Sequence, residues 1–245
     1  MCRLCKKVCK AFYKHKKVKS NVTDIAFKKE EIKEEKEMDY KLESFPYLTQ
    51  TDNKLFSSTT CYPTSMAMAM KWCMKIASYS EYEIGCPLSM QLEDYITQIT
   101  ESKETKAWIK RNVSKYGAWM LNYKPRTLAY VEEYIFNKLM NPLGFKSRFS
   151  ANITYKAYCK HLAQKNMPIV LHGDFSSVSS VAGHIVCGVG FRNDDNSVIL
   201  HDPFGNALLD KYKSHEDGEY AVYPVNLVMK DKKRMRLWGQ IIEKI

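Results

Sequence analysis

Cys61 is the residue of this chain best suited to nucleophilic chemistry. Pro63 and an apolar run with helical spacing follow it, so the sequence predicts a helix from Cys61 to Ala77 with the cysteine in its first turn. The free N–H groups and the positive end of the helix dipole stabilise a thiolate at this place, and a neighbouring base would complete the activation. A buried first-turn cysteine without a role is the ordinary alternative, and Cys61 taken alone favours it.

A histidine and an aspartate further along the chain have the arrangement that such a base requires. His184 opens an apolar strand after Gly183, and Asp202 ends the next apolar strand. A hairpin between these strands would place Asp202 beside His184, where the carboxylate accepts the Nδ1 proton and fixes the tautomer. The alternative is a surface histidine and a turn-initiating aspartate, since Asp-Pro-x-Gly is an ordinary turn sequence.

Gln50 lies in a polar loop shortly before Cys61. Its carboxamide N–H₂ could join the backbone N–H of Cys61 in an oxyanion hole, which stabilises the charge that develops on a carbonyl oxygen under attack. A polar loop residue without a role is the alternative.

The elements that must position these residues change type along the chain. Helical spacing is clear over residues 61–77, extends over most of residues 88–141, and returns in a short helix near residues 155–162. Apolar strand patterns follow at residues 168–172, 184–191 and 198–202, with further candidates at 221–223 and 237–242. Helices followed by antiparallel strands indicate an α+β fold.

The ordered motifs resemble those of papain-like cysteine peptidases, in particular the double-glycine-peptidase-like branch related to phage and cell-wall proteins. The similarity runs from about Phe45 to Trp238. It is carried by four segments, Gln50-x-Asp52-Asn53, Cys61-Tyr62-Pro63-Thr64-Ser65-Met66-Ala67-Met68, Gly183-His184-Ile185-Val186 and His201-Asp202-Pro203-Phe204-Gly205.

This resemblance implies a papain-like fold in which the cysteine helix packs on an antiparallel sheet, here with a helical insertion. It implies four roles: nucleophile for Cys61, base for His184, orienting residue for Asp202 and oxyanion donor for Gln50. Tyr62 replaces the usual small or amide residue after the nucleophile and could narrow the cleft. Phe204 replaces the more common tyrosine, which should have little effect.

Two other histidines compete with His184 for the role of base. His172 ends a predicted strand, and Asp174 follows closely, so this pair could imitate a catalytic dyad. His201 adjoins Asp202, but alternation along a strand would point it to the opposite face. The order of the motifs favours His184.

The charge of the chain is unevenly distributed. The formal net charge is +11, and the first 20 residues contain eight basic residues and no acidic one. We therefore predict an N-terminal arm, residues 1–44, and a peptidase domain, residues 45–245. The arm suits an anionic partner such as nucleic acid, a lipid surface or a cell-wall polymer. A solvated tail is an equal alternative.

A zinc site formed by Cys2, Cys5, Cys9 and His15 is disfavoured, because the spacing matches no known finger.

The leading functional hypothesis is hydrolysis of an amide bond in a cell-wall peptide cross-link or a Gly-rich protein site. The alternatives are a catalytically silent relative that binds or assembles, for example in a virion, and nucleic-acid binding through the basic segment. The sequence predicts no cofactor, no metal site, no signal peptide and no membrane-spanning run. The scattered cysteines favour reduced thiols, with Cys73, Cys86, Cys159 and Cys187 as small core residues.

Overall fold

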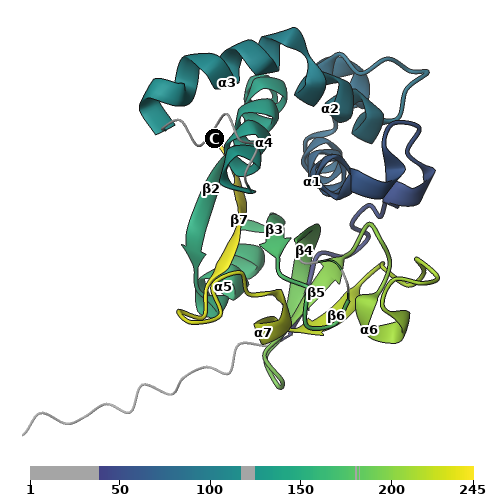
Figure 1. Cartoon of the computed structure of the whole chain (residues 1–245), viewed down its shortest axis with the longest axis vertical. Helices are drawn as coiled ribbons and strands as arrows, with labels where there is room; N and C mark the ends of the chain where they lie inside the picture. The colour runs from purple at the N-terminus through teal and green to yellow at the C-terminus, as the bar shows by residue number, and fades with distance from the viewer. Residues whose placement is uncertain (1–38, 117–124, 180, 182) are drawn as a thin grey trace, which may run out of the picture. The chain divides into compact units, whose positions relative to one another are not determined.

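The structure is a computed structural model that describes residues 39–116, 125–179, 181 and 183–245 (Figure 1). The chain divides into two units, Met1–Glu35 and Lys36–Ile245, and all the described residues belong to the second unit. The basic segment 1–20 and the cluster of Cys2, Cys5, Cys9 and His15 lie outside the described residues. The boundary between an arm 1–44 and a domain 45–245 stays a prediction.

The second unit is built on one antiparallel sheet, in which the described residues form seven strands. Six strands lie in the order β2-β7-β3-β4-β5-β6, and β1 pairs with β4 beyond the end of β3. The strands are Tyr40–Lys41 (β1), Phe145–Ile153 (β2), Ile169–Gly173 (β3), His184–Arg192 (β4), Ser197–His201 (β5), Ala221–Pro224 (β6) and Leu237–Lys244 (β7).

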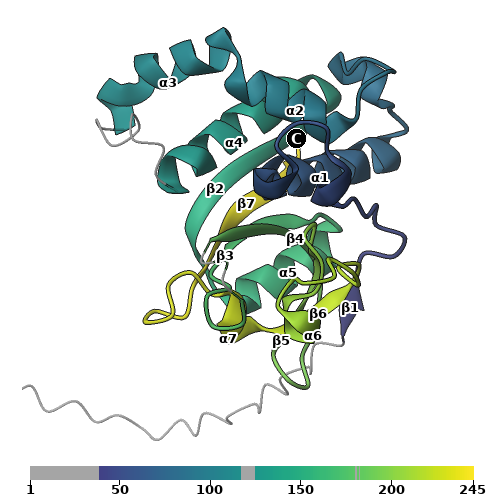
Figure 2. The ribbon, with the colours of Figure 1, turned by 45° about the vertical axis from the view of Figure 1, so that its right-hand side comes forward.

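Four helices gather on one side of this sheet, as Figures 1 and 2 show. They are Cys61–Ala77 (α1), Leu92–Glu101 (α2), Lys103–Tyr116 (α3) and Pro125–Met140 (α4). The other α-helices of the described residues are Tyr155–Lys165 (α5), Ala207–Asp210 (α6) and Val225–Val228 (α7). Within the described residues, no helix is both long enough and apolar enough to cross a bilayer.

β4 is covered on both faces, which explains its continuous apolar sequence. Cys187 lies close enough to Cys73 of α1 for the two thiols to interact. A Cβ built on the next residue, Gly188, would lie 2.7 Å from the hydroxyl of Tyr158 in α5. Because consecutive strand residues point to opposite faces, α1 and α5 cover opposite sides of β4. Only glycine at position 188 lets α5 approach this closely.

α1 is buried around most of its circumference, not along one face as its periodicity predicts. Every residue from Tyr62 to Met70 is buried. The sheet lies on one side of the helix, and α2 and α4 pack on it as well. A helix with neighbours all round presents its first turn at a fixed place, which matters for Cys61.

The predicted fold class is confirmed. The unit is α+β, with the Cys61 helix packed on an antiparallel sheet and with α2, α3 and α4 forming the helical insertion. The strand β2 was not predicted. Its residues do not alternate cleanly between buried and exposed, because three residues in its middle are only partly buried, and it pairs with β7 through an irregular register.

Candidate active site

Cys61 is the first residue of α1, and its partly exposed side chain lines a cavity of about 200 Å³ together with His184. Among the described residues, no side chain caps this end of α1, since the hydroxyl of Thr60 accepts a hydrogen bond from Asn53 Nδ2 at 2.7 Å instead. The N–H groups of the first turn therefore remain available to an anion, either the thiolate or a reacting oxygen.

Asn53 connects the preceding loop to α1. Besides Thr60, its Nδ2 donates to Thr64 Oγ1 at 2.9 Å, and its side chain is buried. These bonds fix the loop that carries Gln50 against the first turn of the helix. The sequence assigned Asn53 no role beyond its place in a motif, because a polar loop residue gives no sign of what it will contact.

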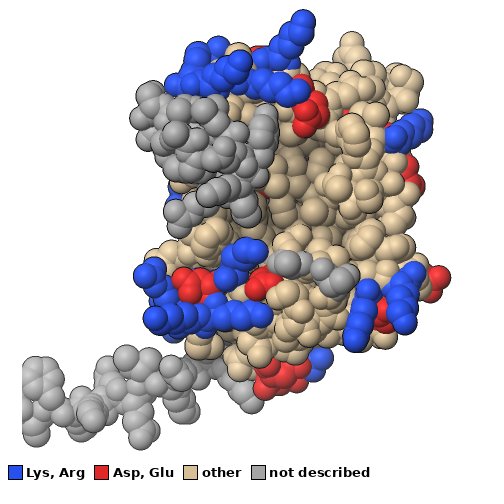
Figure 3. Space-filling view, viewed as in Figure 1, with Lys and Arg blue, Asp and Glu red and all other residues tan. Residues whose placement is uncertain are grey.

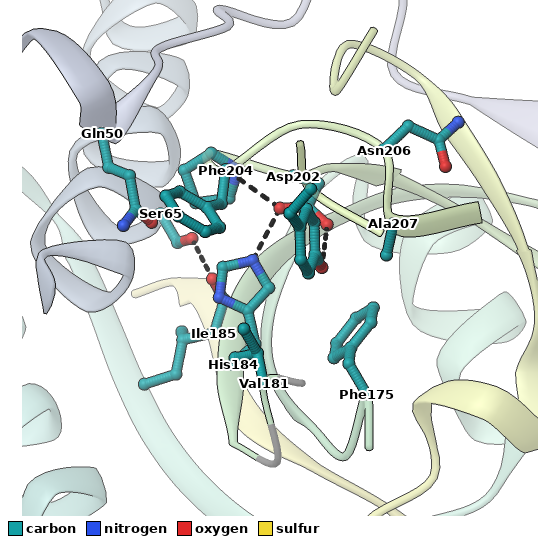
Figure 4. A network of polar contacts seen from close by, with 12 residues as sticks. Gln50, Ser65, Phe175, Val181, His184, Ile185, Asp202, Phe204, Asn206 and Ala207 are labelled. Carbon is teal, nitrogen blue, oxygen red and sulfur yellow. Dashed lines mark hydrogen bonds and ion pairs between the residues drawn. The ribbon is translucent and has the colours of Figure 1, made fainter. Parts of the chain in front are cut away.

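His184, at the start of β4, lies beside Asp202, which directly follows β5. His184 Nε2 is 2.6 Å from Asp202 Oδ1 (Figure 4). The prediction that Asp202 accepts from Nδ1 is therefore wrong. The rotation of the ring decides which nitrogen meets the carboxylate, and that rotation depends on packing, here against the rings of Phe175 and Tyr212. With Nε2 engaged, Nδ1 is the nitrogen left for Cys61, whose thiol interacts with the same ring.

The surroundings of His184 favour its charged form. Complete burial lowers the pKa of the imidazole, but Asp202 and Cys61 act in the opposite direction and raise it to about 10. At neutral pH the ring is an imidazolium beside the sulfur of Cys61. A positive charge at this place stabilises a thiolate and holds a proton ready for transfer.

The carboxylate of Asp202 is fully buried and surrounded by donors. Its Oδ1 accepts from the backbone N–H of Phe204 at 3.0 Å, in addition to His184. Its Oδ2 accepts from the hydroxyls of Tyr212 at 2.8 Å and Tyr223 at 3.1 Å. Burial and the nearby carboxylate raise the pKa of both tyrosines, so they stay protonated donors. Sequence reasoning missed both, since nothing distinguishes them among 16 tyrosines.

Gln50 begins a 3₁₀ turn, Gln50–Asp52, and its side chain is buried. Its backbone N–H donates to Pro203 O at 2.8 Å, which anchors the loop next to the turn that follows Asp202. Nε2 donates to Ser57 O at 3.0 Å, and an amide nitrogen carries a second hydrogen for another acceptor. In Figure 4, Gln50 and Ser65 of α1 lie on the same side of the His184 ring.

The competing pair of His172 and Asp174 does not form. His172 Nε2 lies 2.6 Å from Glu132 Oε2 of α4, and both side chains are buried. Asp174 instead accepts from Ser176 and lies 3.9 Å from the Nζ of Lys232. Sequence reasoning missed Glu132, because an acidic residue in a helical stretch is usually exposed.

Two further predictions concern His201 and Tyr62. His201 points away from His184, as strand alternation predicts, and its Nδ1 lies 3.2 Å from Pro46 O. Tyr62 does not narrow the cleft. Its side chain is 4% exposed and packs in the core, because the second residue of α1 faces inward. The four predicted core cysteines Cys73, Cys86, Cys159 and Cys187 are buried, and none of them forms a disulfide among the described residues.

Comparison with known families agrees with this fold. A family model described as Peptidase_C39 like family matches residues 42–224, a range that contains Gln50, Cys61, His184 and Asp202. The fold and the match define a papain-like cysteine peptidase branch. The chain belongs to this C39-like peptidase family. No curated protein and no solved structure matches it significantly.

In the part of the chain that the structure describes, no group of three or more His, Cys, Asp or Glu side chains could hold a metal ion.

Proposed function

We propose that this protein is a cysteine peptidase that hydrolyses an amide bond, with Cys61 as nucleophile, His184 as general acid and base, Asp202 as orienting residue and Gln50 as oxyanion donor. The observation that carries the proposal is that one imidazole interacts with both a helix N-terminal thiol and a buried carboxylate. These are the three parts that an activated cysteine requires.

The first half of the reaction forms an acyl-enzyme. The Cys61 sulfur attacks the carbonyl carbon of the substrate, and the backbone N–H of Cys61 together with the second hydrogen of Gln50 Nε2 binds the oxygen that becomes negative. The His184 imidazolium then transfers its Nδ1 proton to the leaving amine. The carbon–nitrogen bond breaks, and a thioester of Cys61 and a neutral imidazole remain.

The second half releases the acid. Neutral His184 Nδ1 takes a proton from a water molecule, whose oxygen attacks the thioester carbonyl. The carbon–sulfur bond breaks, the Cys61 thiolate leaves, and the imidazolium is restored. Nε2 donates its hydrogen bond to Asp202 throughout the reaction. The ring therefore keeps Nδ1 on the side of the sulfur.

The substrate that we propose is a peptide. A peptide cross-link of peptidoglycan and a Gly-rich site in a protein are the two candidates, in accordance with the phage and cell-wall proteins that the motifs resemble. Both offer an unhindered amide to a partly exposed cysteine. An association with a virion is a further part of this hypothesis.

The test is cleavage of a mixed library of peptides and muropeptides, followed by mass spectrometry. We expect new termini with the unmodified chain and with Cys159→Ala, which alters a buried cysteine of α5. We expect none above background with Cys61→Ala. Unchanged cleavage by Cys61→Ala would remove the assignment of the nucleophile.

A further inference from the structure

The cavity beside Cys61 contains more than the proposed catalytic residues. Its volume is about 200 Å³, and Leu128, Ile185 and Trp238 contribute apolar walls. Two other polar side chains line it, His172 of β3 and Lys230, which follows α7. Their charges decide what the cavity can bind.

His172 of the cavity wall is bonded to a buried partner, Glu132. Glu132 is fully buried, and its Oε2 is engaged by His172 and by Gln240 Nε2 at 3.2 Å. No Lys or Arg of the described residues forms an ion pair with it. A buried charge without a partner costs several kcal/mol. The two side chains are therefore held by each other, and neither is directed at a ligand.

Lys230, in contrast, brings a positive charge that forms no ion pair with any described residue. A Cβ placed on Gly183, which also lines the cavity, would lie 3.9 Å from Lys230 Nζ. Among the described residues, no carboxylate lies within ion-pair distance of this ammonium. The nearby carboxylate of Asp174 is already engaged by Ser176 and faces Lys232 at 3.9 Å.

The loop that begins with Lys230 adds to this charge. Residues 230–236 contain five basic residues and one acid, a net charge of 5 − 1 = +4. The acid, Asp231, is occupied by the backbone N–H of Arg234 at 3.0 Å. Two backbone hydrogen bonds between Asp231 and Arg236 close the loop into a defined turn. In Figure 3, Lys and Arg side chains gather at the lower left, where Figure 1 draws this loop between α7 and β7.

We propose that the cavity is a substrate subsite for a carboxylate, with Lys230 as its counter-ion. The apolar part of the acidic residue would pack against Trp238 and Leu128, and the loop 230–236 would attract the anionic chain. This inference rests on the proposed function and narrows its substrates to peptides that carry an acidic group next to the cleaved amide. The carboxylate can belong to a side chain or to a chain terminus.

Binding to the full chain carrying Cys61→Ala tests the subsite without requiring turnover. The probes are octapeptides on an array, in which each position in turn holds Glu, Gln or Lys, with amidated and with free C-termini. We expect one position at which Glu binds about tenfold more tightly than Gln. Tighter binding of peptides with a free C-terminus than of their amidated forms, at equal binding of Glu and Gln, would identify a terminal carboxylate as the ligand.

Three variants in the Cys61→Ala chain assign that preference to Lys230. Lys230→Gln should reduce the Glu-to-Gln ratio to about one, and Lys230→Glu should move the preference to Lys at the same position. Lys233→Gln, which alters an exposed lysine of the same loop, should leave the Glu-to-Gln ratio unchanged. Circular dichroism confirms that each variant is folded.

The outcomes separate this inference from the proposed function. The subsite would be overturned by equal binding of Glu and Gln peptides together with equal binding of free and amidated C-termini, or by a preference that survives Lys230→Gln. The same peptides incubated with the chain that retains Cys61 test hydrolysis separately. Charge-selective binding without cleavage would support the subsite and count against the proposed peptidase activity. Cleavage without charge preference would support the peptidase activity and count against the subsite.

Discussion

Two buried histidine–carboxylate pairs, His184–Asp202 and His172–Glu132, lie side by side in this fold with almost the same geometry. In each, Nε2 of the histidine is 2.6 Å from a carboxylate oxygen. The histidines lie on adjacent strands, where His172 pairs with Ile185, and both line the cavity that contains Cys61.

Their surroundings differ. Both oxygens of Asp202 accept from donors beyond the histidine, whereas Glu132 Oε1 is buried with no partner among the described residues. The thiol of Cys61 interacts with the ring of His184 and contributes to its raised pKa. The comparison teaches that a buried histidine–carboxylate pair does not by itself make a catalytic site. Two features distinguish His184–Asp202 from His172–Glu132. The thiol of Cys61, the nucleophile that we propose, lies at the free ring nitrogen of His184, and both carboxylate oxygens of Asp202 are hydrogen-bonded.

The largest expected difference between the pairs is in turnover. His184→Ala should reduce kcat/KM on a cleaved peptide by about 10³-fold, because the proton donor and acceptor is lost. His172→Ala should reduce it by less than about tenfold. Both variants are compared with the unmodified chain after circular dichroism has shown that they fold. Equal losses of kcat/KM in the two variants would show that His184 and His172 do not differ in their contribution to turnover.

The second pair should matter more for stability. Glu132→Ala removes the acceptor from two buried donors, His172 and Gln240, and should lower the free energy of unfolding by about 4 kcal/mol. Glu133→Ala is the matched control, because this neighbour accepts only the N–H of Phe149 in a half-buried place, and it should cost about 1 kcal/mol. Urea unfolding measures both, and similar values for the two would contradict the structural role of Glu132.

The raised pKa of His184 should make stability fall with pH. The pKa rises on folding from 6.5 to about 10, so the stabilisation is fully present below pH 6.5 and is lost as pH rises through 10. Between pH 7 and pH 9 the loss should be about 2–3 kcal/mol, at about 1.4 kcal/mol per pH unit. Urea unfolding of the unmodified chain and of His184→Ala gives the difference. A difference that does not change over this range would refute the ion pair.

The smallest expected effect concerns the donors around Asp202. Tyr212→Phe removes one hydroxyl from the carboxylate and should lower kcat/KM about fivefold, which corresponds to about 1 kcal/mol. Tyr220→Phe is the control, since its hydroxyl bonds to Leu42 and Phe45 and not to Asp202. If both substitutions have the same effect, the hydroxyl of Tyr212 does not support the site.

The parts of the fold that follow from local patterns were predictable. The spacing of apolar residues in α1 and the strand patterns of β3, β4 and β5 predict these elements within a residue or so. The strand β2 was missed, because its partly polar sequence becomes a strand only by pairing with β7.

The site could be predicted only as far as its motifs extend. Cys61, His184, Asp202 and Gln50 each stand in a recognisable segment, although their catalytic roles stay a proposal. Glu132, Tyr212 and Tyr223 could not be found, since each meets its partner through tertiary packing; Glu132 and His172, for example, are 40 residues apart. The ring nitrogen that faces Asp202 was predicted wrongly for the same reason, because neighbouring side chains set the rotation of the ring.

We propose that His184, and not His172, activates Cys61. The most direct test is the rate at which iodoacetamide alkylates Cys61 at pH 6, followed by mass spectrometry of the peptide that contains it. An ordinary thiol is almost fully protonated at this pH and reacts slowly. We expect rapid alkylation in the unmodified chain and in His172→Ala, and a rate at least about tenfold lower in His184→Ala. Equal rates in the unmodified chain and in His184→Ala would contradict this proposal.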